Sequence, residues 1–184
     1  PPSLADNTAD CDRLRLTLAR QIQAKDLPVD LVLARKLPIY LRDFNYQARC
    51  VIFGDHTSPT LIAVLPPEDD TVAAGVAIDL GTTRVVVRLI NLESDDYMAE
   101  TSFENPQTAI GDDILTRIHF AETENGLDQL HRLIIDGINK AIGELCDIGQ
   151  ITPNDIYLLS VAGNTAMTHL LLNLSPRWII REPY

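Results

Sequence analysis

Residues 76–89, VAIDLGTTRVVVRL, decide how this sequence is expected to fold. A short apolar run reaches Asp79, a Gly-Thr-Thr turn follows, and a run rich in β-branched residues returns. Two such runs around a glycine-containing turn are typical of a β-hairpin. A third run at 97–103, after the polar turn ESDD at 93–96, extends the hairpin to an antiparallel meander. The run at 84–92 is apolar almost throughout, which predicts a strand that is covered on both faces.

Helical patterns follow the meander. A short helix capped by Asp112 or Asp113 is expected first. Residues 127–148 then place apolar side chains three and four positions apart, which is typical of a helix lying on a sheet. The apolar run at 156–162 predicts a further buried strand, and a helix opens after Gly-Asn-Thr at 163–165. The predicted order is therefore three strands, two helices, a strand and a helix.

Residues 1–70 have a different pattern, that of a small α+β unit. Pro38 is expected to end the second of its two helices. Its predicted elements are two helices and a hairpin, at residues 10–23, 29–36, 46–53 and 60–65. PPEDD at 66–70 is a polar, proline-led boundary. The fold class is predicted to be α/β, with a small α+β domain at 1–70 and a second domain at 74–184.

The composition excludes several classes of function. The formal net charge is −11 and no basic stripe is present, which argues against binding to nucleic acid. Three distant cysteines, Cys11, Cys50 and Cys146, form no CxxC pair and predict neither a zinc nor an iron–sulfur ligand set. Their number fits a reducing compartment, so we expect a cytoplasmic protein. The apolar stretches are too short to span a membrane.

The Asp-Leu-Gly-Thr-Thr turn has two interpretations. Glycine permits a positive φ, and Asp and Thr are common turn residues, so a plain hairpin turn is one interpretation. The other is a phosphate-binding loop. Asp79 ends a strand that is expected to be buried, where a carboxylate needs a partner such as a cation with its water shell. The amides and hydroxyls of Gly81–Thr83 are able to form a small anion nest.

The meander context favours the second interpretation. VAIDLGTTRVVVRL resembles the first phosphate motif of the nucleotide-binding fold shared by acetate kinase, sugar kinases, actin and heat-shock chaperones. The resemblance implies a partial actin-like, ribonuclease H-like lobe with the order βββαα-βα. It implies that Asp79 orients Mg²⁺ through water and that Gly81, Thr82 and Thr83 contact the phosphates of ATP.

Three further stretches narrow the family: PSLADNTADCDRL at 2–14, NPQTAIGDDILTRI at 105–118 and VAGNTAMTHLLLNL at 161–174. Together with the loop, they resemble the reductive activators of corrinoid enzymes, also called corrinoid activation/regeneration proteins. Such proteins return an oxidised Co(II) corrinoid to Co(I), coupling electrons from a [2Fe–2S] domain to ATP. The resemblance implies Mg-ATP as a cofactor, a corrinoid protein as partner, and a homodimer.

The resemblance also implies that this chain is a fragment. It would contain the middle domain at 1–70 and the first part of a truncated ATP-binding domain at 74–184. The [2Fe–2S] domain would precede it and the second ATP lobe would follow it. Alone, the chain is expected to be inactive and to bind ATP weakly or not at all.

Two further groups of residues carry functional interpretations beside structural ones. Gly163, Asn164 and Thr165 would bind the nucleotide or form an ordinary helix cap. Asn105, Gln107, Asp113 and Arg117 would serve coupling or the substrate lobe, or Asp113 would cap a helix and pair with Arg117. Two other functions stay open: a sugar or acyl kinase that uses the same loop, and a dimerisation or docking module.

Overall fold

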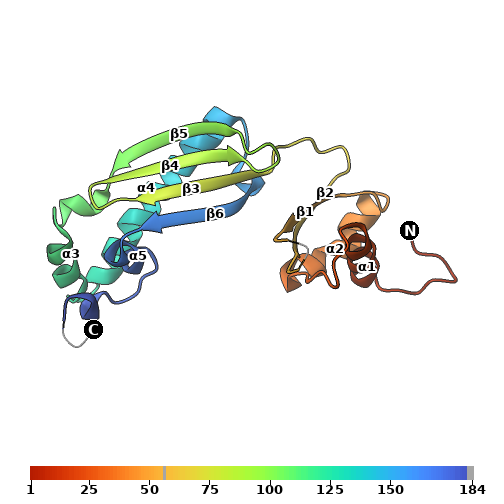
Figure 1. Ribbon diagram of the computed structural model, residues 1–184, viewed down its shortest axis with the longest axis horizontal. Coiled ribbons are helices and arrows are strands. Elements are labelled where there is room, and N and C mark those ends of the chain that lie inside the picture. The colour runs from red at the N-terminus through yellow and green to blue at the C-terminus, as the bar shows by residue number, and fades with distance from the viewer. Residues whose placement is uncertain (56, 182–184) are drawn as a thin grey trace. The chain divides into compact units, whose positions relative to one another are not determined.

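The computed structural model describes residues 1–55 and 57–181, which form two compact units, Pro1–Asp70 and Thr71–Tyr184 (Figure 1). His56 and residues 182–184 lie outside the described residues. Each unit has a hydrophobic core of its own. The units are therefore described separately.

The first unit combines two helices with a hairpin. Its elements are α1 (Asp10–Gln21), α2 (Leu31–Asp43), β1 (Arg49–Phe53) and β2 (Thr60–Leu65). β1 and β2 pair antiparallel, with Arg49 opposite Leu65, as the sequence predicted. The core is centred on Leu27, Leu37 and Leu61, none of which is exposed. The helices and the hairpin therefore share one small core.

Helix α2 continues through Pro38, so the prediction that this proline ends the helix was wrong. A proline inside a helix costs about 3 kcal/mol, because it removes one hydrogen bond and crowds the preceding turn. Leu37 and Leu41 flank it and are 0% and 4% exposed. Burying each leucine contributes about 1.5–3 kcal/mol, so their packing offsets the cost of the proline.

The second unit follows the predicted order of elements. Its strands are β3 (Ala74–Leu80), β4 (Arg84–Asn91), β5 (Tyr97–Glu104) and β6 (Ile156–Gly163). Its helices are α3 (Ile114–Ala121), α4 (Gly126–Gly149) and α5 (Thr165–Leu171), with short 3₁₀ turns η1 (Pro106–Ala109), η2 (Pro153–Asp155) and η3 (Arg177–Ile180). The strand order is β5-β4-β3-β6, and β6 runs parallel to β3 beside the antiparallel meander. The structure therefore has the expected α/β fold.

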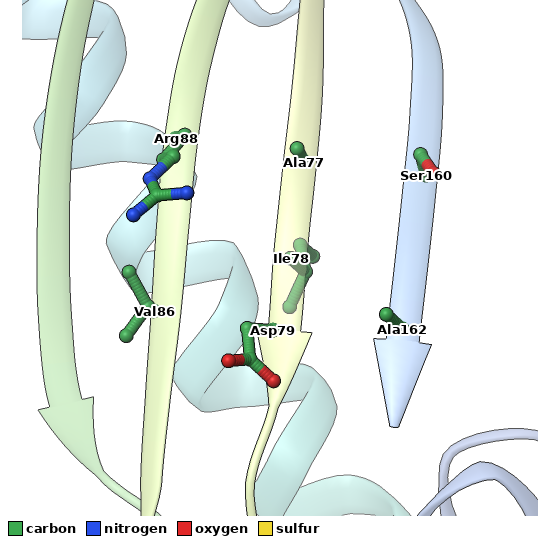
Figure 2. A pocket seen from close by; sticks show the side chains of 7 residues that line it. All are labelled: Ala77, Ile78, Asp79, Val86, Arg88, Ser160 and Ala162. Atoms are coloured by element: carbon green, nitrogen blue, oxygen red, sulfur yellow. The ribbon is translucent and has the colours of Figure 1, made fainter. Parts of the chain in front are cut away.

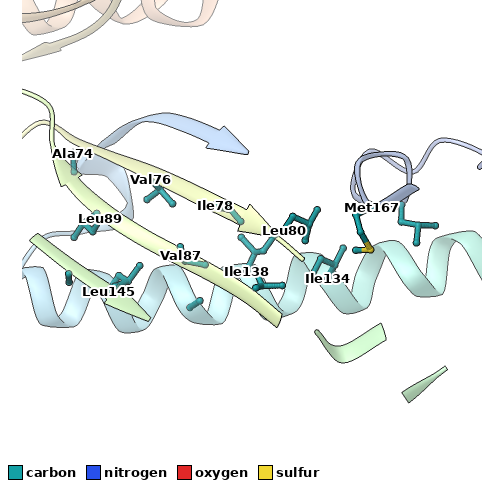
Figure 3. Packing of buried hydrophobic residues seen from close by; sticks show 14 of the residues in the cluster. Ala74, Val76, Ile78, Leu80, Val87, Leu89, Ile134, Ile138, Leu145 and Met167 are labelled. Carbon is teal, nitrogen blue, oxygen red and sulfur yellow. The ribbon is translucent and has the colours of Figure 1, made fainter. Parts of the chain in front are cut away.

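Helix α4 covers one face of this sheet, as Figure 3 shows. Val76, Ile78 and Leu80 alternate along β3 and point toward the helix, where Ile134 and Ile138 meet them. The predicted apolar stripe of α4 is buried along most of its length. Its last member is an exception, because Ile148 is 62% exposed. The stripe fixes which face of the sheet is closed and which stays open.

Two strands are less covered than their composition indicated. On β4, Val85 and Val87 are buried, but Arg84 and Arg88 are exposed, so the described residues cover one face only. The edge strand β6 was expected to be buried, yet Leu159 is 54% exposed. Apolar and β-branched residues suit any pleated strand, so their abundance does not distinguish one covered face from two.

Candidate functional site

The ends of β3 and β6 bring two of the candidate segments together. The two strands are parallel, and Leu80 pairs with Gly163, so the turns that follow them leave the same edge of the sheet. Asn164 Nδ2 donates a hydrogen bond of 3.2 Å to Thr82 Oγ1 across this edge. The Gly81–Thr83 loop and the Gly-Asn-Thr turn therefore form one cluster.

Gly81 is required by a close approach of backbone to backbone. A Cβ at this position would lie 2.3 Å from the carbonyl oxygen of Arg84, which is closer than real side chains come. Gly81 does not use the positive φ that glycine permits, because among the described glycines only Gly54 adopts one. The glycine allows the turn to fold tightly onto itself, in an otherwise ordinary backbone conformation.

Asn105 forms hydrogen bonds with this loop from the interior of the unit. The residue is completely buried, and its Nδ2 donates to the carbonyl oxygen of Gly81 at 2.9 Å. Its backbone N–H donates to the carbonyl oxygen of Thr83 at 2.7 Å. Its Oδ1 accepts from the backbone N–H of Gln107 at 3.0 Å and so caps η1. One buried side chain thus connects the loop to the segment after β5.

Gln107 and Arg117 continue the buried polar network. Gln107 Nε2 donates to the carbonyl oxygen of Leu130 in α4 at 2.9 Å. Arg117 is completely buried and donates from Nε to the carbonyl oxygen of Gly111 at 2.7 Å. Arg117 Nη1 lies 3.4 Å from Gln107 Oε1 and 3.7 Å from Met167 Sδ in α5. The network therefore joins the segment after β5 to both α4 and α5.

No carboxylate among the described residues pairs with Arg117. Asp113 instead caps α3, since its Oδ1 and Oδ2 accept from the backbone and the hydroxyl of Thr116 at 2.9 and 2.7 Å. These bonds, first that of the hydroxyl, lower the pKa of Asp113. Burial lowers the pKa of Arg117, and the nearby charges of Asp112 and Asp113 oppose this shift. The expected Asp113–Arg117 pair is absent, and Asp113 stands apart from the loop cluster.

Asp79 occupies the open face of the sheet near the end of β3. Figure 2 shows its carboxylate on the same face as Arg88, the two belonging to neighbouring strands. A shallow hollow of about 250 Å³ lies there, lined also by Ala77, Val86 and Ser160. The expectation that Asp79 is buried was wrong, because its neighbours Ile78 and Leu80 take the α4 side and the pleat turns Asp79 outward.

The Asp79 carboxylate forms no hydrogen bond or ion pair with another described residue, whereas Arg88 Nε binds Glu100 Oε2 at 2.6 Å. Sequence reasoning missed Arg88 and Ser160 as neighbours of the aspartate. The hairpin register contained a signal for the first: Asp79 pairs with Val86 and Ala77 with Arg88, which places Arg88 diagonally across from Asp79. The position of Ser160 depends on how β6 joins the sheet.

The donors present suit a phosphate and a water-bound cation rather than a directly bound transition metal. The described residues contain no group of three or more His, Cys, Asp or Glu side chains able to hold a metal ion. One carboxylate is sufficient for Mg²⁺ that keeps its water shell. Backbone amides and hydroxyls in a tight loop are the donors that phosphate groups use.

In the same described residues, no helix is long and apolar enough to cross a membrane.

Comparisons with known proteins agree along the chain. Residues 1–71 match the family model described as the RACo linker region, and residues 74–184 match the RACo middle region. The name that we expected for the first domain differs from the one the family uses. We expected residues 1–70 to be the middle domain, whereas the family model that matches this part is that of the linker region.

Two relatives match this chain along nearly all of its residues. The corrinoid activation enzyme RamQ from Eubacterium limosum is 29% identical over 179 residues, which cover 96% of this chain and 29% of that protein. A solved structure, the reductive activator for corrinoid, iron-sulfur protein, superposes with a TM-score of 0.88 at 34% identity. The superposition covers 100% of this chain and 29% of that one. The chain thus spans less than a third of the length of either relative. Because the two family models match nearly all of its residues in order, the chain belongs to the RACo family of reductive activators of corrinoid proteins.

Proposed function

We propose that this chain contains the first phosphate loop of an ATP-dependent reductive activator, which returns an oxidised Co(II) corrinoid on a partner protein to Co(I). The observation that carries the proposal is the loop Gly81–Thr83 beside Asp79, in a chain that matches the RACo family along its length. The names of the relatives, which describe corrinoid activation, support the part of the proposal that concerns corrinoid reduction. The loop and its neighbours support the part that concerns nucleotide binding.

The residues present fit Mg-ATP at this edge of the sheet. Thr82 and Thr83 supply hydroxyls and backbone amides, and these amides form no hydrogen bond within the described part of the chain. Thr82 Oγ1 already accepts from Asn164, which leaves its own O–H available to donate to an anion. Asp79 would hold a water-coordinated Mg²⁺ from the open face. Bound Mg²⁺ would neutralise the charge of the phosphates in a protein that is itself acidic.

The cysteines of this chain do not provide a ligand set for the [2Fe–2S] cluster that would supply the electrons. A [2Fe–2S] cluster takes four ligands, commonly four thiolates, and this sequence has three cysteines in total. Cys11 and Cys50 belong to the first unit, and Cys146 is buried in the second. Burial also raises the pKa of the Cys50 thiol to about 11, away from the thiolate form that binds iron. We therefore place the proposed [2Fe–2S] cluster in another part of the protein.

These assignments give nucleotide binding and electron transfer to different parts of the whole protein. Nucleotide binding at the loop would favour the conformation in which electrons reach the cobalt of the partner, so ATP would act through the equilibrium between conformations. The chain alone supplies the loop and Asp79 but not the electron source. We propose that it binds MgATP weakly without the rest of the protein, and that a homodimer and a cytoplasmic location apply to the whole protein.

The test uses the full-length protein with Asp79→Asn. Removing a residue that orients a metal through water typically costs 10–100-fold in affinity or activity, so ATPase and Co(I) formation should both fall by about that factor. Co(I) formation is followed by the absorbance of the corrinoid. Asp95→Asn is the matched control, because Asp95 is exposed in the turn at the other end of β4. Equal ATPase in the two variants would refute the role of Asp79.

The same loop could serve a kinase, and the products distinguish the two functions. A kinase would transfer the terminal phosphoryl group to a sugar or an acyl group, whereas the proposed activator releases inorganic phosphate or only binds ATP. A phosphorylated organic product from the full-length protein would replace our proposal with the kinase.

A further inference from the structure

The buried side chain of Asn105, which lies outside the hairpin, forms a hydrogen bond with the Gly81–Thr83 loop. Asn105 contacts two carbonyl oxygens of the loop, through Nδ2 to Gly81 and through its backbone N–H to Thr83. It comes from the segment after β5, which is 24 residues away in the sequence from Gly81. The loop therefore has direct hydrogen bonds to a segment outside the hairpin.

Because the peptide bond is planar, these two hydrogen bonds to carbonyl oxygens also determine the direction of the N–H groups that follow them in the loop. In a trans peptide, the C=O and the following N–H point in opposite directions. The carbonyl of Gly81 points down to Asn105, so the N–H of Thr82 points away from Asn105. The carbonyl of Thr83 likewise points to Asn105, so the N–H of Arg84 is turned away from it. A phosphate-binding loop needs N–H groups with this outward orientation.

Asn105 is itself held firmly. Its Oδ1 caps η1 through the N–H of Gln107, and Gln107 Nε2 is bound to the carbonyl oxygen of Leu130. Leu130 belongs to α4, the helix that packs against the closed face of the sheet. Three hydrogen bonds in series, Asn105 to Gly81, Gln107 to Asn105 and Gln107 to Leu130, thus connect the loop to the core of the second unit, which limits how far the loop can move.

We propose that Asn105 is the positioning residue of the phosphate loop: its amide holds the Gly81 carbonyl inward, so that the Thr82 N–H faces the phosphate. This inference rests on the function proposed for the loop and assigns the orientation of that site to a residue that does not touch the nucleotide. It replaces the earlier expectation that Asn105 acts in coupling or in the substrate lobe.

Asn105→Asp separates this role from simple capping. Aspartate has the same shape and keeps an oxygen that caps η1, but it cannot donate to the Gly81 carbonyl. The carboxylate would face that carbonyl oxygen in a buried place, and the loop peptide should turn away. Losing a buried hydrogen bond and leaving its partner unsatisfied predicts about 10- to 100-fold weaker binding of MgATP to the full-length protein.

The control makes the same exchange at the other end of β4. Asn91 Oδ1 accepts from the backbone N–H of Glu93 at 2.8 Å, much as Asn105 Oδ1 does from Gln107. Asn91→Asp therefore adds one negative charge and keeps the same kind of bond, at a distance from the loop. It should leave MgATP affinity within about twofold of the wild type, because exposed charges interact weakly in water.

Two measurements on the full-length protein decide the inference: calorimetric titration with MgATP, and hydrogen–deuterium exchange of the peptide that contains Gly81–Arg84. We expect weaker binding and faster exchange confined to this peptide in Asn105→Asp. Unchanged affinity and unchanged exchange would overturn the inference and leave the proposed function standing. Exchange that increases throughout the second unit would assign Asn105 a purely structural role and also overturn it.

The two measurements also separate a failure of the proposed function. If the wild type binds no MgATP, the nucleotide function fails, and the exchange of the loop peptide alone still decides whether Asn105 positions it. If Asn105→Asp does not fold, Asn105→Ser takes its place, because serine keeps a capping oxygen, loses the amide and adds no charge. The same local increase in exchange is expected from Asn105→Ser, and exchange equal to the wild type would refute the role.

Discussion

Replacing Gly81 with alanine tests whether the loop has the tight geometry described above. The new Cβ would lie 2.3 Å from the carbonyl oxygen of Arg84, where ordinary contact begins near 3.4 Å, so the turn must open by about 1 Å. Overpacking of this kind costs about 1–3 kcal/mol. Opening the turn also strains the 2.9 Å bond from Asn105, which contributes about 1 kcal/mol. The free energy of unfolding should therefore fall by about 2–4 kcal/mol.

Urea unfolding measures this loss. With a slope of about 2 kcal/mol per molar urea, the transition of the second unit should move down by about 1–2 M in Gly81→Ala. Gly143→Ala in α4 is the matched control, because apart from its chain neighbours and the nearby backbone of its own helix no atom lies within 4 Å of its added Cβ. Alanine is a better helix former, so this variant should gain about 0.5–1 kcal/mol. An unchanged midpoint in Gly81→Ala would refute the tight turn.

Three further predictions concern the site, the buried arginine and the thiols. Asp79→Asn should lower ATPase and Co(I) formation together about 10–100-fold while the urea midpoint stays unchanged. Arg117→Ala should destabilise the second unit by about 2–5 kcal/mol, and Arg117→Met by clearly less, since methionine fills the space without a buried charge; equal losses would contradict this. Burial raises the pKa of Cys50 to about 11, above its usual value near 9. The protonated thiol therefore stabilises the fold below pH 9, and this contribution should be lost between pH 9 and 11. Cys50→Ala should flatten the fall in urea midpoint over that range, and an equally steep fall would contradict the assignment.

The order of the elements was predictable because each one has a local signal. The loop at 81–83 marks the hairpin, and the spacing of Leu130, Ile134 and Ile138 marks α4. The pairing of β6 with β3 was not predictable in this way, since hydrogen bonds between distant strands leave no local pattern. The outward turn of Asp79 was open to prediction from the period of two along β3, but the apolar residues around it suggested burial instead.

The site itself was only partly predictable. The Gly81–Thr83 loop and the Gly-Asn-Thr turn were both singled out as candidates, and the structure brings them together through Asn164 and Thr82. Asn105 was singled out without its actual contacts, because a bond from its side chain to the Gly81 carbonyl depends on tertiary packing. The structural interpretation of Arg117 paired it with Asp113, whereas in the structure Arg117 is buried and contacts Gly111 and Met167 instead.

The most direct test of the central claim is a crystal structure of the full-length protein with Mg²⁺ and a non-hydrolysable ATP analogue. Our account predicts phosphate oxygens within hydrogen-bond distance of the Thr82 backbone N–H, and a hydrated metal ion facing Asp79 on the open side of the sheet. Phosphates bound at another place, with the Gly81–Thr83 loop free of the nucleotide, would contradict it.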